Sequence, residues 1–396
     1  MSIRPAVWTT RLTTPGAGAF AVLFGLEALG RAVVTAALPL QSLRLMGSDE
    51  GVSLLFLVGS VSAVSMAFIV PRVVERLGRA RLCTLAILLI TSAAGLFALG
   101  ALSSQVLGFI CRSCGVAALY AGLSMFIMEH IKRQELGRSE PLRMLSIGLS
   151  WTVGPLLGVQ IEATWGEVAP FLASACIGLL LLGYFWALRF GNLPIVRAAP
   201  RQRGESPLAN VGAYFSQPRF LLAWLHGTGR GFFWLCFVIY TPLYAHATGL
   251  GASAGGLLVS IGSGFMILVP TWGWVARRFG IRWISLLAFP VAAASCLTAG
   301  LLADWPWLGG AMLVTAAAAM TVIDGYGNAL FLRACRPSQR AALTPIFSSH
   351  RDVGDITQAA LFALLLSFFP IQVVFVTVGL VLTGLALLSL KINRRL

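Results

Sequence analysis

The stretch PRVVERLGRAR, residues 71–81, is a short basic segment between two long apolar runs. A second version, GWVARRFGIRW, occupies residues 273–283, so that Gly78 is matched by Gly280. Six-helix repeats related about the membrane normal, with the binding site between them, are a known architecture of membrane proteins. The repeated stretch therefore predicts an all-α polytopic membrane protein, with two six-helix pseudo-repeats around a central cavity.

The composition agrees with this fold class. Hydrophobic residues make up 58% of the chain, charged residues only 11%, and the mean hydropathy is +0.85. Soluble domains carry roughly a quarter charged residues, and an apolar run of about 20 residues predicts a membrane helix. Twelve transmembrane helices are predicted, at 17–40, 51–71, 82–102, 105–128, 142–162, 168–190, 219–243, 253–275, 283–303, 307–331, 341–369 and 371–390.

The charge pattern predicts the topology. The formal net charge is +15, and the basic residues gather in every second loop. Such a bias follows the positive-inside rule, which places these loops and both termini in the cytoplasm. The topology accounts for the excess of basic residues, so nucleic acid is not predicted as a partner. The polar stretch 191–218 is predicted to be a cytoplasmic linker between an N-terminal half, 1–190, and a C-terminal half, 219–396. An integral protein of a bacterial inner membrane, in contact with the lipid bilayer, is expected.

The loop at 71–81 resembles the loop motif of the major facilitator superfamily, and the resemblance extends over essentially the whole chain. The family motif is Gly-x-x-x-Asp-(Arg/Lys)-x-Gly-(Arg/Lys)-(Arg/Lys), and the matching positions here are Pro71, Glu75, Arg76, Gly78, Arg79 and Arg81. The second copy keeps Gly280 but has Arg277 at the acidic position. The resemblance implies a transporter in which this loop acts as a gating element.

Two further segments resemble the drug:proton antiporter branch of that family. Residues Gly154, Pro155 and Gly158 match the core of its antiporter motif in the fifth span, although Ser150 replaces one of its glycines. The fourth span carries Arg112, where many of these antiporters also have an arginine. Gly154 and Gly158 lie on one helix face, which lets another helix approach closely. Ordinary helix packing is the alternative reading of this glycine pair.

Ionisable residues inside the predicted spans are the candidate functional groups, because a charge at the bilayer centre needs a partner or a wet cavity. The proton-coupling candidates are Glu27, Asp324, Asp352 and Asp355. The substrate-cavity candidates are Arg31, Arg112, His226, Arg230, Tyr326, Asn328, His350 and Arg351. The four arginines and four carboxylates balance in formal charge.

Glu27 and Arg31 stand one helical turn apart in the first span, in the favourable orientation for an i, i+4 pair. In drug:proton antiporters an acidic residue of the first helix often exchanges a proton for substrate, so the resemblance suggests Glu27 as the coupling carboxylate. The alternative is an ion pair that only allows the helix to insert.

The segment HRDVGD, residues 350–355, places Arg351 and two carboxylates, Asp352 and Asp355, on one arc of the eleventh span. One arginine facing two carboxylates leaves a surplus negative charge, which favours a reversible proton site. A structural Arg–Asp network is the alternative. In the tenth span, Asp324 is predicted to be a gate, a second proton carrier or the partner of an arginine.

These features predict a proton-coupled secondary active transporter that exports a small amphiphilic or anionic organic compound by alternating access. The chain has no Gly-Lys-Ser/Thr phosphate loop, so an ion gradient rather than ATP is the expected energy source. A proton-coupled importer of a small metabolite is the main alternative. A membrane-embedded enzyme is a second alternative, disfavoured by the lack of a nucleophile or cofactor motif. No cofactor or metal is expected, and the resemblance suggests a monomer.

Overall fold

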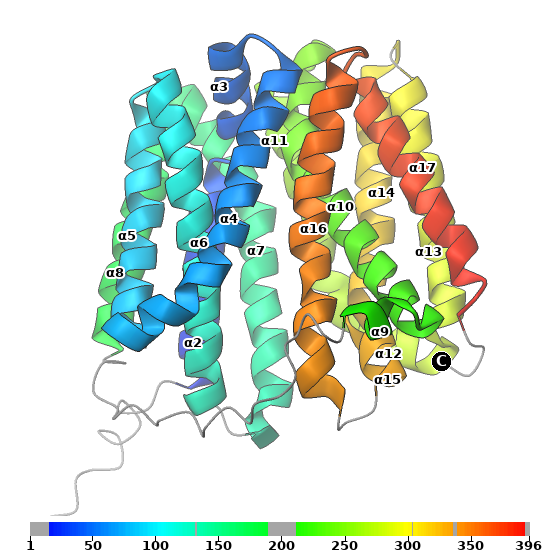
Figure 1. Cartoon of the computed structure of the whole chain (residues 1–396). Coiled ribbons are helices and arrows are strands. Elements are labelled where there is room, and N and C mark those ends of the chain that lie inside the picture. The colour runs from blue at the N-terminus through cyan, green and yellow to red at the C-terminus, as the bar shows by residue number, and fades with distance from the viewer. Residues whose placement is uncertain (1–15, 131–132, 189–210, 303, 336–338, 393–396) are drawn as a thin grey trace, which may run out of the picture. The chain divides into compact units, whose positions relative to one another are not determined.

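The chain is almost entirely α-helical in the computed structural model, which describes residues 16–130, 133–188, 211–302, 304–335 and 339–392 (Figure 1). Within these ranges it contains no β-strand. The helices of the first half are α2 Ala17–Val33, α3 Ala37–Met46, α4 Asp49–Leu77, α5 Arg79–Ala98, α6 Leu102–His130, α7 Arg133–Trp165 and α8 Ala169–Ala187. The all-α fold class is confirmed.

The second half repeats this organisation of long helices joined by short turns. Its elements are α9 Val211–Phe215, α10 Pro218–Ala247, α11 Ala252–Gly264, the 3₁₀ helix η3 Phe265–Leu268, α12 Val269–Phe279, α13 Ile281–Leu301, α14 Pro306–Tyr326, α15 Ala329–Ala334, α16 Arg340–Leu366 and α17 Gln372–Ser389. Every predicted span corresponds to one or two of these helices.

Nine helical segments of the described chain are long and apolar enough to cross a membrane, and ten if the bent pair α2 and α3 forms one span. The helices α10 and α16 are also long, but they carry more polar groups and fall outside this set. The chain is thus an integral membrane protein, and twelve crossings stay a prediction.

The first predicted span, 17–40, is broken rather than continuous. Helix α2 ends at Val33, α3 begins at Ala37, and the two are bent by 41°. Pro39 explains the break, because a proline has no N–H to bond the carbonyl four residues earlier, here Thr35, and its ring clashes with it. The tenth span is also broken, at Gly327, whose φ of 48° lies in the left-handed region.

By its internal contacts the chain divides into two compact units. Unit 1 contains Met1–Ala37 and Val61–Pro194, and unit 2 contains Leu38–Ser60 and Ile195–Leu396. The division into halves at 1–190 and 219–396 with a linker at 191–218 stays a prediction. Residues 191–210 of that linker lie outside the described residues.

In unit 1, α2 is held closely against α7 by the predicted glycine pair. A Cβ atom built on Gly154 would overlap the side chain of Ala32, and one on Gly158 would overlap the carbonyl oxygen of Val33. The prediction that these glycines allow close helix approach is confirmed. The consequence is that α2, which carries Glu27 and Arg31, has a fixed position on α7.

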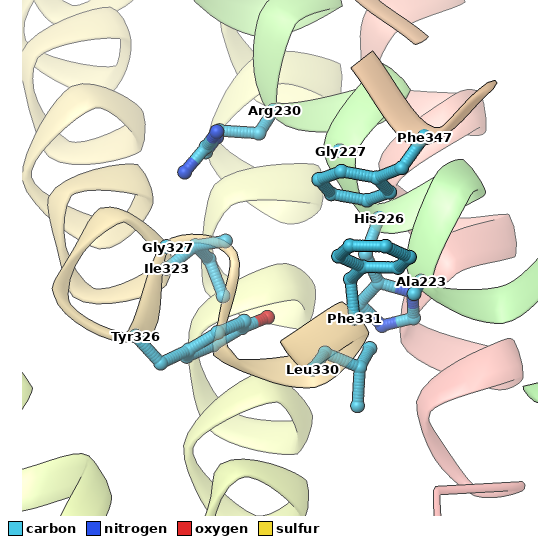
Figure 2. A pocket seen from close by; sticks show the side chains of 10 residues that line it. All are labelled: Ala223, His226, Gly227, Arg230, Ile323, Tyr326, Gly327, Leu330, Phe331 and Phe347. Atoms are coloured by element: carbon cyan, nitrogen blue, oxygen red, sulfur yellow. The ribbon is translucent and has the colours of Figure 1, made fainter. Parts of the chain in front are cut away.

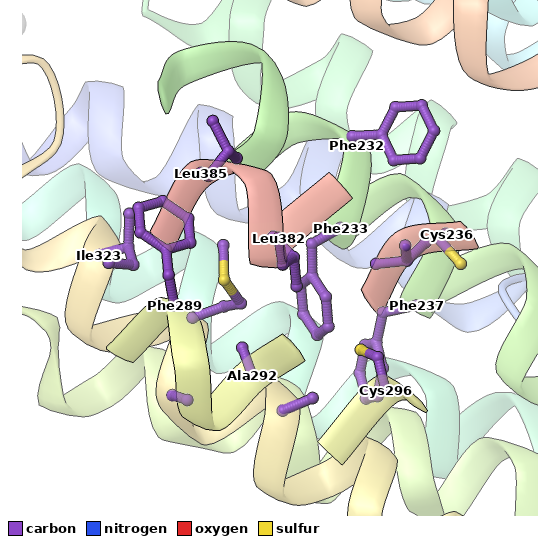
Figure 3. Packing of buried hydrophobic residues seen from close by; sticks show 14 of the residues in the cluster. Phe232, Phe233, Cys236, Phe237, Phe289, Ala292, Cys296, Ile323, Leu382 and Leu385 are labelled. Carbon is purple, nitrogen blue, oxygen red and sulfur yellow. The ribbon is translucent and has the colours of Figure 1, made fainter. Parts of the chain in front are cut away.

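The core of unit 2 is built around the aromatic face of α10 (Figure 3). Phe233 and Phe237 stack with their ring centroids 5.7 Å apart, and both rings are buried. Helix α13 contributes Phe289, and α17 contributes Leu382. Leu40 and Val52, which come from α3 and α4, belong to the same core, as do further residues of all these helices. The packing fixes α10, from which Arg230 extends.

The repeated loop has the same backbone geometry in both copies. Gly78 has φ 81° and ψ 165°, and Gly280 has φ 89° and ψ 146°. Each precedes the next long helix directly, and a residue with a Cβ would be strained at such a φ. The sequence repeat at these positions therefore reflects a repeated turn.

Candidate functional site: one charged cluster in each unit

Helix α2 carries a two-point ion pair between Arg31 and Glu27. The Nε of Arg31 lies 2.6 Å from Oε1 of Glu27, and its Nη2 donates to Oε2 at 2.9 Å. The carboxylate is buried, with 3% of the residue exposed. The Nη2 contact is a charge-assisted hydrogen bond, and the close Nε contact adds electrostatic attraction, so both carboxylate oxygens face the guanidinium. The one-turn pairing expected from the sequence is present.

Two aromatic residues frame this ion pair. The Nη2 of Arg31 donates to the hydroxyl oxygen of Tyr120 at 3.0 Å, and its guanidinium carbon lies 5.7 Å from the ring centroids of both Tyr120 and Trp151. Tyr120 comes from α6 and Trp151 from α7. Three helices therefore converge on Arg31, and the cluster combines a charge with aromatic faces.

Arg112, also on α6, adds a second positive charge to this cluster. It is near enough to Arg31 and Glu27 to interact with both electrostatically. Within the part of the chain that the structure describes, it has no hydrogen bond and no ion pair of 4 Å or less. The cluster of unit 1 thus contains two guanidinium groups and one carboxylate, and its formal charge is +1.

Two serines attach α2 to its neighbours close to the ion pair. Ser150 of α7 donates to the carbonyl of Gly25 at 2.8 Å, and Ser174 of α8 donates to the carbonyl of Gly30 at 2.7 Å. These bonds lie on either side of Glu27 along the helix. Ser150 stands where the antiporter motif has a glycine, so its hydroxyl adds a contact that a glycine lacks.

Unit 2 contains the second cluster, between α10 and α14. The Nε of Arg230 lies 3.6 Å from Oδ1 of Asp324, and the indole N–H of Trp234 donates to Oδ2 at 2.8 Å. Arg230 also donates to the side-chain oxygen of Asn328 at 3.4 Å. Of the three roles predicted for Asp324, the structure provides the arginine partner, and the cluster is neutral.

A small cavity adjoins this second cluster (Figure 2). Its volume of about 10 Å³ leaves room for about one water molecule. Figure 2 shows Arg230 above Ile323 and Gly327, with Tyr326 below them and the rings of Phe331 and Phe347 opposite. The two phenylalanine rings are stacked, with centroids 4.3 Å apart.

Tyr326 and His226, both predicted to line a substrate cavity, border this space but are engaged by protein groups. The Tyr326 hydroxyl lies 2.9 Å from that of Ser285. The Nδ1 of His226 donates to the carbonyl of Leu222 at 2.8 Å, and its Nε2 lies 3.0 Å from the hydroxyl of Ser389. His226 is thus a core histidine in this structure, and its role towards substrate stays a prediction.

The side chains of the HRDVGD segment on α16 face two different environments, one against α10 and one at the surface. The Nδ1 of His350 donates to the carbonyl of Phe347 at 2.6 Å, and its ring lies so near α10 that a Cβ on Gly227 would approach it to 2.8 Å. Arg351 and Asp352 are at the surface of the unit and Asp355 is half-buried. Among the described residues, none of these three charged side chains has an ion pair of 4 Å or less. A reversible proton site and a structural Arg–Asp network both stay predictions for this segment.

In the gating motif, Glu75 and Arg76 are exposed at the end of α4, whereas Arg79 is half-buried at the start of α5. Helix α7 runs through Pro155 without interruption. The gating role of these residues, together with Gly78, Gly280 and the α7 glycines, stays a prediction.

Several site contacts were not predicted from the sequence. Tyr120 and Ser174 hold the unit 1 cluster from helices that are distant along the chain, and no local pattern marks them. Trp234 is different, because it follows Arg230 by one helical turn, a spacing that brings two side chains onto the same face. That spacing was the available signal for its contact with Asp324.

Long apolar helices with charged clusters at their faces define a polytopic membrane protein. The chain belongs to the Major Facilitator Superfamily, whose family model matches residues 20–356. Membership makes the protein a transporter and not an enzyme. A "Sugar efflux transporter A" of Dickeya chrysanthemi is 25% identical over 272 residues, which cover 67% of this chain and 66% of that protein.

Solved transporter structures share the fold. A POT family transporter in complex with a thioalcohol-conjugated peptide has a TM-score of 0.77 at 12% identity, covering 94% of this chain and 95% of that chain. A point mutant of the nucleoside transporter NupG has a TM-score of 0.71 at 13% identity, covering 94% of this chain and 98% of that chain. At these identities the similarity concerns the fold alone.

Proposed function

We propose that this protein is a proton-coupled exporter of a small amphiphilic organic compound with sugar-like hydroxyl groups. The observation that carries the proposal is the buried carboxylate of Glu27, held by Arg31 beside the rings of Tyr120 and Trp151. The similarity to a sugar efflux transporter supports both the direction and the substrate chemistry.

The unit 1 cluster suits such a compound. A sugar has one apolar face of C–H groups and a rim of hydroxyls, which donate and accept hydrogen bonds. The ring of Trp151 offers a flat apolar surface for that face. Glu27 accepts hydrogen bonds from hydroxyls, while Arg31 and Arg112 donate to hydroxyl oxygens.

Coupling to protons follows from the chemistry of Glu27. An ionised carboxylate accepts a hydrogen bond from a substrate hydroxyl, whereas a protonated carboxyl loses much of that capacity. Proton and substrate therefore compete for the same oxygens, and binding one releases the other. In the present structure Arg31 occupies both oxygens, so the ion pair must open during the cycle. Asp324, Asp352 and Asp355 are the other candidate proton carriers, and the two on α16 have no ion pair of 4 Å or less with any described residue.

The same proposal includes the membrane topology. The protein lies in a bacterial inner membrane with both termini in the cytoplasm, and it works as a monomer. An inward proton gradient then drives the compound out of the cell.

The test uses purified protein in proteoliposomes with an imposed pH gradient and a panel of neutral sugars, zwitterions and organic anions. Gradient-driven flux of a neutral sugar is expected for the wild type and for Asp352→Asn/Asp355→Asn, and its loss is expected for Glu27→Gln. Asp304→Asn, which neutralises an exposed carboxylate far along the chain from α2, is the matched control. A flux that ignores the pH gradient in every variant overturns proton coupling.

A second candidate, a proton-coupled importer of an organic anion, is favoured by one observation, which is the lack of an ion pair for Arg112 within the described residues. If the substrate is an anion bound at Arg112, proton and substrate favour each other's binding instead of competing. A proton on Glu27 neutralises the carboxylate, releases Arg31 and makes the cluster more positive. Proton and anion then bind together and move in the same direction. In the proteoliposome assay, anion uptake that runs with the proton gradient selects this candidate.

A further inference from the structure

An apolar groove lies at one end of unit 2, apart from the charged clusters. It is formed by the beginning of α10, by α15 and by the end of α17, and its volume is about 350 Å³. Leucines dominate its wall, including Leu222 and Leu225 of α10, Leu330 of α15 and Leu388 of α17. The volume falls in the range of small-molecule sites, roughly 300–1,000 Å³. The groove therefore has both the size and the lining for a hydrocarbon chain.

Two positive charges border this apolar wall. Arg219 and Lys391 line the groove, and no acidic residue of the described chain does so. The Nε and Nη2 of Arg219 donate to the side-chain oxygen of Gln217 at 3.2 and 2.9 Å, and its guanidinium lies over the ring of Phe220 at 4.7 Å. Gln217 is neutral, so these contacts orient Arg219 without cancelling its charge. The groove begins where α10 starts, so the positive end of the helix dipole adds to both charges.

The geometry points to a binding site for an anionic phospholipid, with an acyl chain along the leucines and the phosphate between Arg219 and Lys391. Charge complementarity selects this occupant, because an apolar slot with two cations at its end matches a molecule with a hydrocarbon chain and an anionic head. Basic pockets between membrane helices at the cytoplasmic surface are typical sites for such headgroups. The predicted topology places these helix ends at that surface.

The groove also lies next to the small cavity that adjoins the second cluster. Leu330 lines both the groove and the small cavity next to Arg230, and α15 follows directly after the break at Gly327. A bound acyl chain therefore packs against the short helix that closes the Arg230–Asp324 region. The consequence is that lipid binding stabilises this end of unit 2.

The experiment measures the thermal unfolding midpoint of the full-length protein, purified in detergent, as short-chain phosphatidylglycerol is added. Phosphatidylcholine of the same chain length is the neutral probe, and inorganic phosphate is the probe without a chain. The test variant is Arg219→Gln/Lys391→Gln. The matched control is Arg278→Gln/Arg282→Gln, which also removes two positive charges but leaves the groove unchanged.

We expect phosphatidylglycerol to raise the midpoint of the wild type at lower concentration than phosphatidylcholine does. We expect the half-saturating concentration to rise roughly tenfold or more in Arg219→Gln/Lys391→Gln and to stay unchanged in the control, since each basic residue adds to the attraction of an anionic headgroup. A second variant, Leu222→Trp, narrows the groove and weakens the effect without changing any charge.

Each of four results overturns the site. Equal responses to the two lipids exclude recognition of the headgroup, and an equal loss in both double variants assigns the effect to overall charge. A response to inorganic phosphate that matches phosphatidylglycerol excludes the acyl-chain slot. Displacement of the lipid by a transported compound assigns the groove to the substrate and also contradicts the proposal.

Discussion

Ser53 and Tyr240 are 187 positions apart in the sequence, and their hydroxyl oxygens lie 2.7 Å apart in unit 2. Both residues are almost fully buried. Ser53 donates to the carbonyl of Asp49 at 3.1 Å, so its single proton is engaged and Tyr240 is the donor to Ser53. The bond joins the first turns of α4 to α10, and neighbouring Val52 lies in the same core.

This bond predicts a measurable coupling between Ser53 and Tyr240. Ser53→Ala and Tyr240→Phe each remove one of the two buried hydroxyl groups and leave the other without this partner. Each substitution is expected to destabilise the protein by about 1–2 kcal/mol. The double variant is expected to cost less than the sum, by roughly 1 kcal/mol, because the second substitution removes the unsatisfied group. Unfolding of the four proteins in detergent gives the cycle, and strictly additive effects contradict the bond.

A methyl group at Gly158 is predicted to separate α2 from α7. The Cβ of Gly158→Ala overlaps the carbonyl oxygen of Val33, and overpacking of this kind costs about 1–3 kcal/mol. Gly183→Ala in α8 is the control, because a Cβ there meets nothing within 4 Å. Thermal unfolding checks the pair, and a Gly158→Ala protein as stable as the control rules out the close approach.

Neutralising both members of the Arg230–Asp324 pair is predicted to be milder than neutralising one. Asp324→Asn leaves Arg230 without its ion pair, and Arg230→Gln leaves a carboxylate with only the Trp234 indole, so each is expected to cost about 1–3 kcal/mol. Arg230→Gln/Asp324→Asn restores charge balance and is expected to recover part of that loss. Equal or greater destabilisation of the double variant argues against an ion pair.

Arg112 is predicted to contribute to substrate binding more than to stability. Its guanidinium has no ion pair within the described chain, so Arg112→Gln breaks no salt bridge there, whereas a charge-assisted bond to substrate is worth about 1.5–3 kcal/mol. The expected result is at least a roughly tenfold rise in KM with little change in the unfolding midpoint. Arg112→Lys keeps the positive charge but loses the bidentate geometry of the guanidinium, so its KM is expected to lie between those of the wild type and Arg112→Gln. An unchanged KM in Arg112→Gln removes this residue from the site.

The features that the sequence predicts well are local or periodic. The Glu27–Arg31 pair depends only on one helical turn, and the spans depend on apolar runs of sufficient length. The contacts that it does not predict join distant segments. Tyr120 reaches Arg31 across 89 positions, and Ser389 reaches His226 across 163. No single-sequence pattern specifies which helices become neighbours at those depths.

The breaks in the spans and the state of the α16 charges were also beyond the sequence. A proline such as Pro39 is compatible with either a kink in the helix or a full break. In the structure the helix is broken, and α3 and the start of α4 pack in the same core as α10. The arc shared by Arg351, Asp352 and Asp355 on a helical wheel gives their direction only. Whether side chains on one arc form an ion pair depends on rotamers and on neighbouring groups, which the wheel does not contain.

The account rests on competition between proton and substrate at Glu27, and the most direct measurement is proton release on substrate binding. Purified protein in weak buffer is mixed with a transported neutral sugar while a pH dye records protons. The account predicts release by the wild type and by Asp352→Asn/Asp355→Asn, and none by Glu27→Gln that still binds the sugar. Release of equal size by Glu27→Gln would contradict the account and move the proton site to another carboxylate.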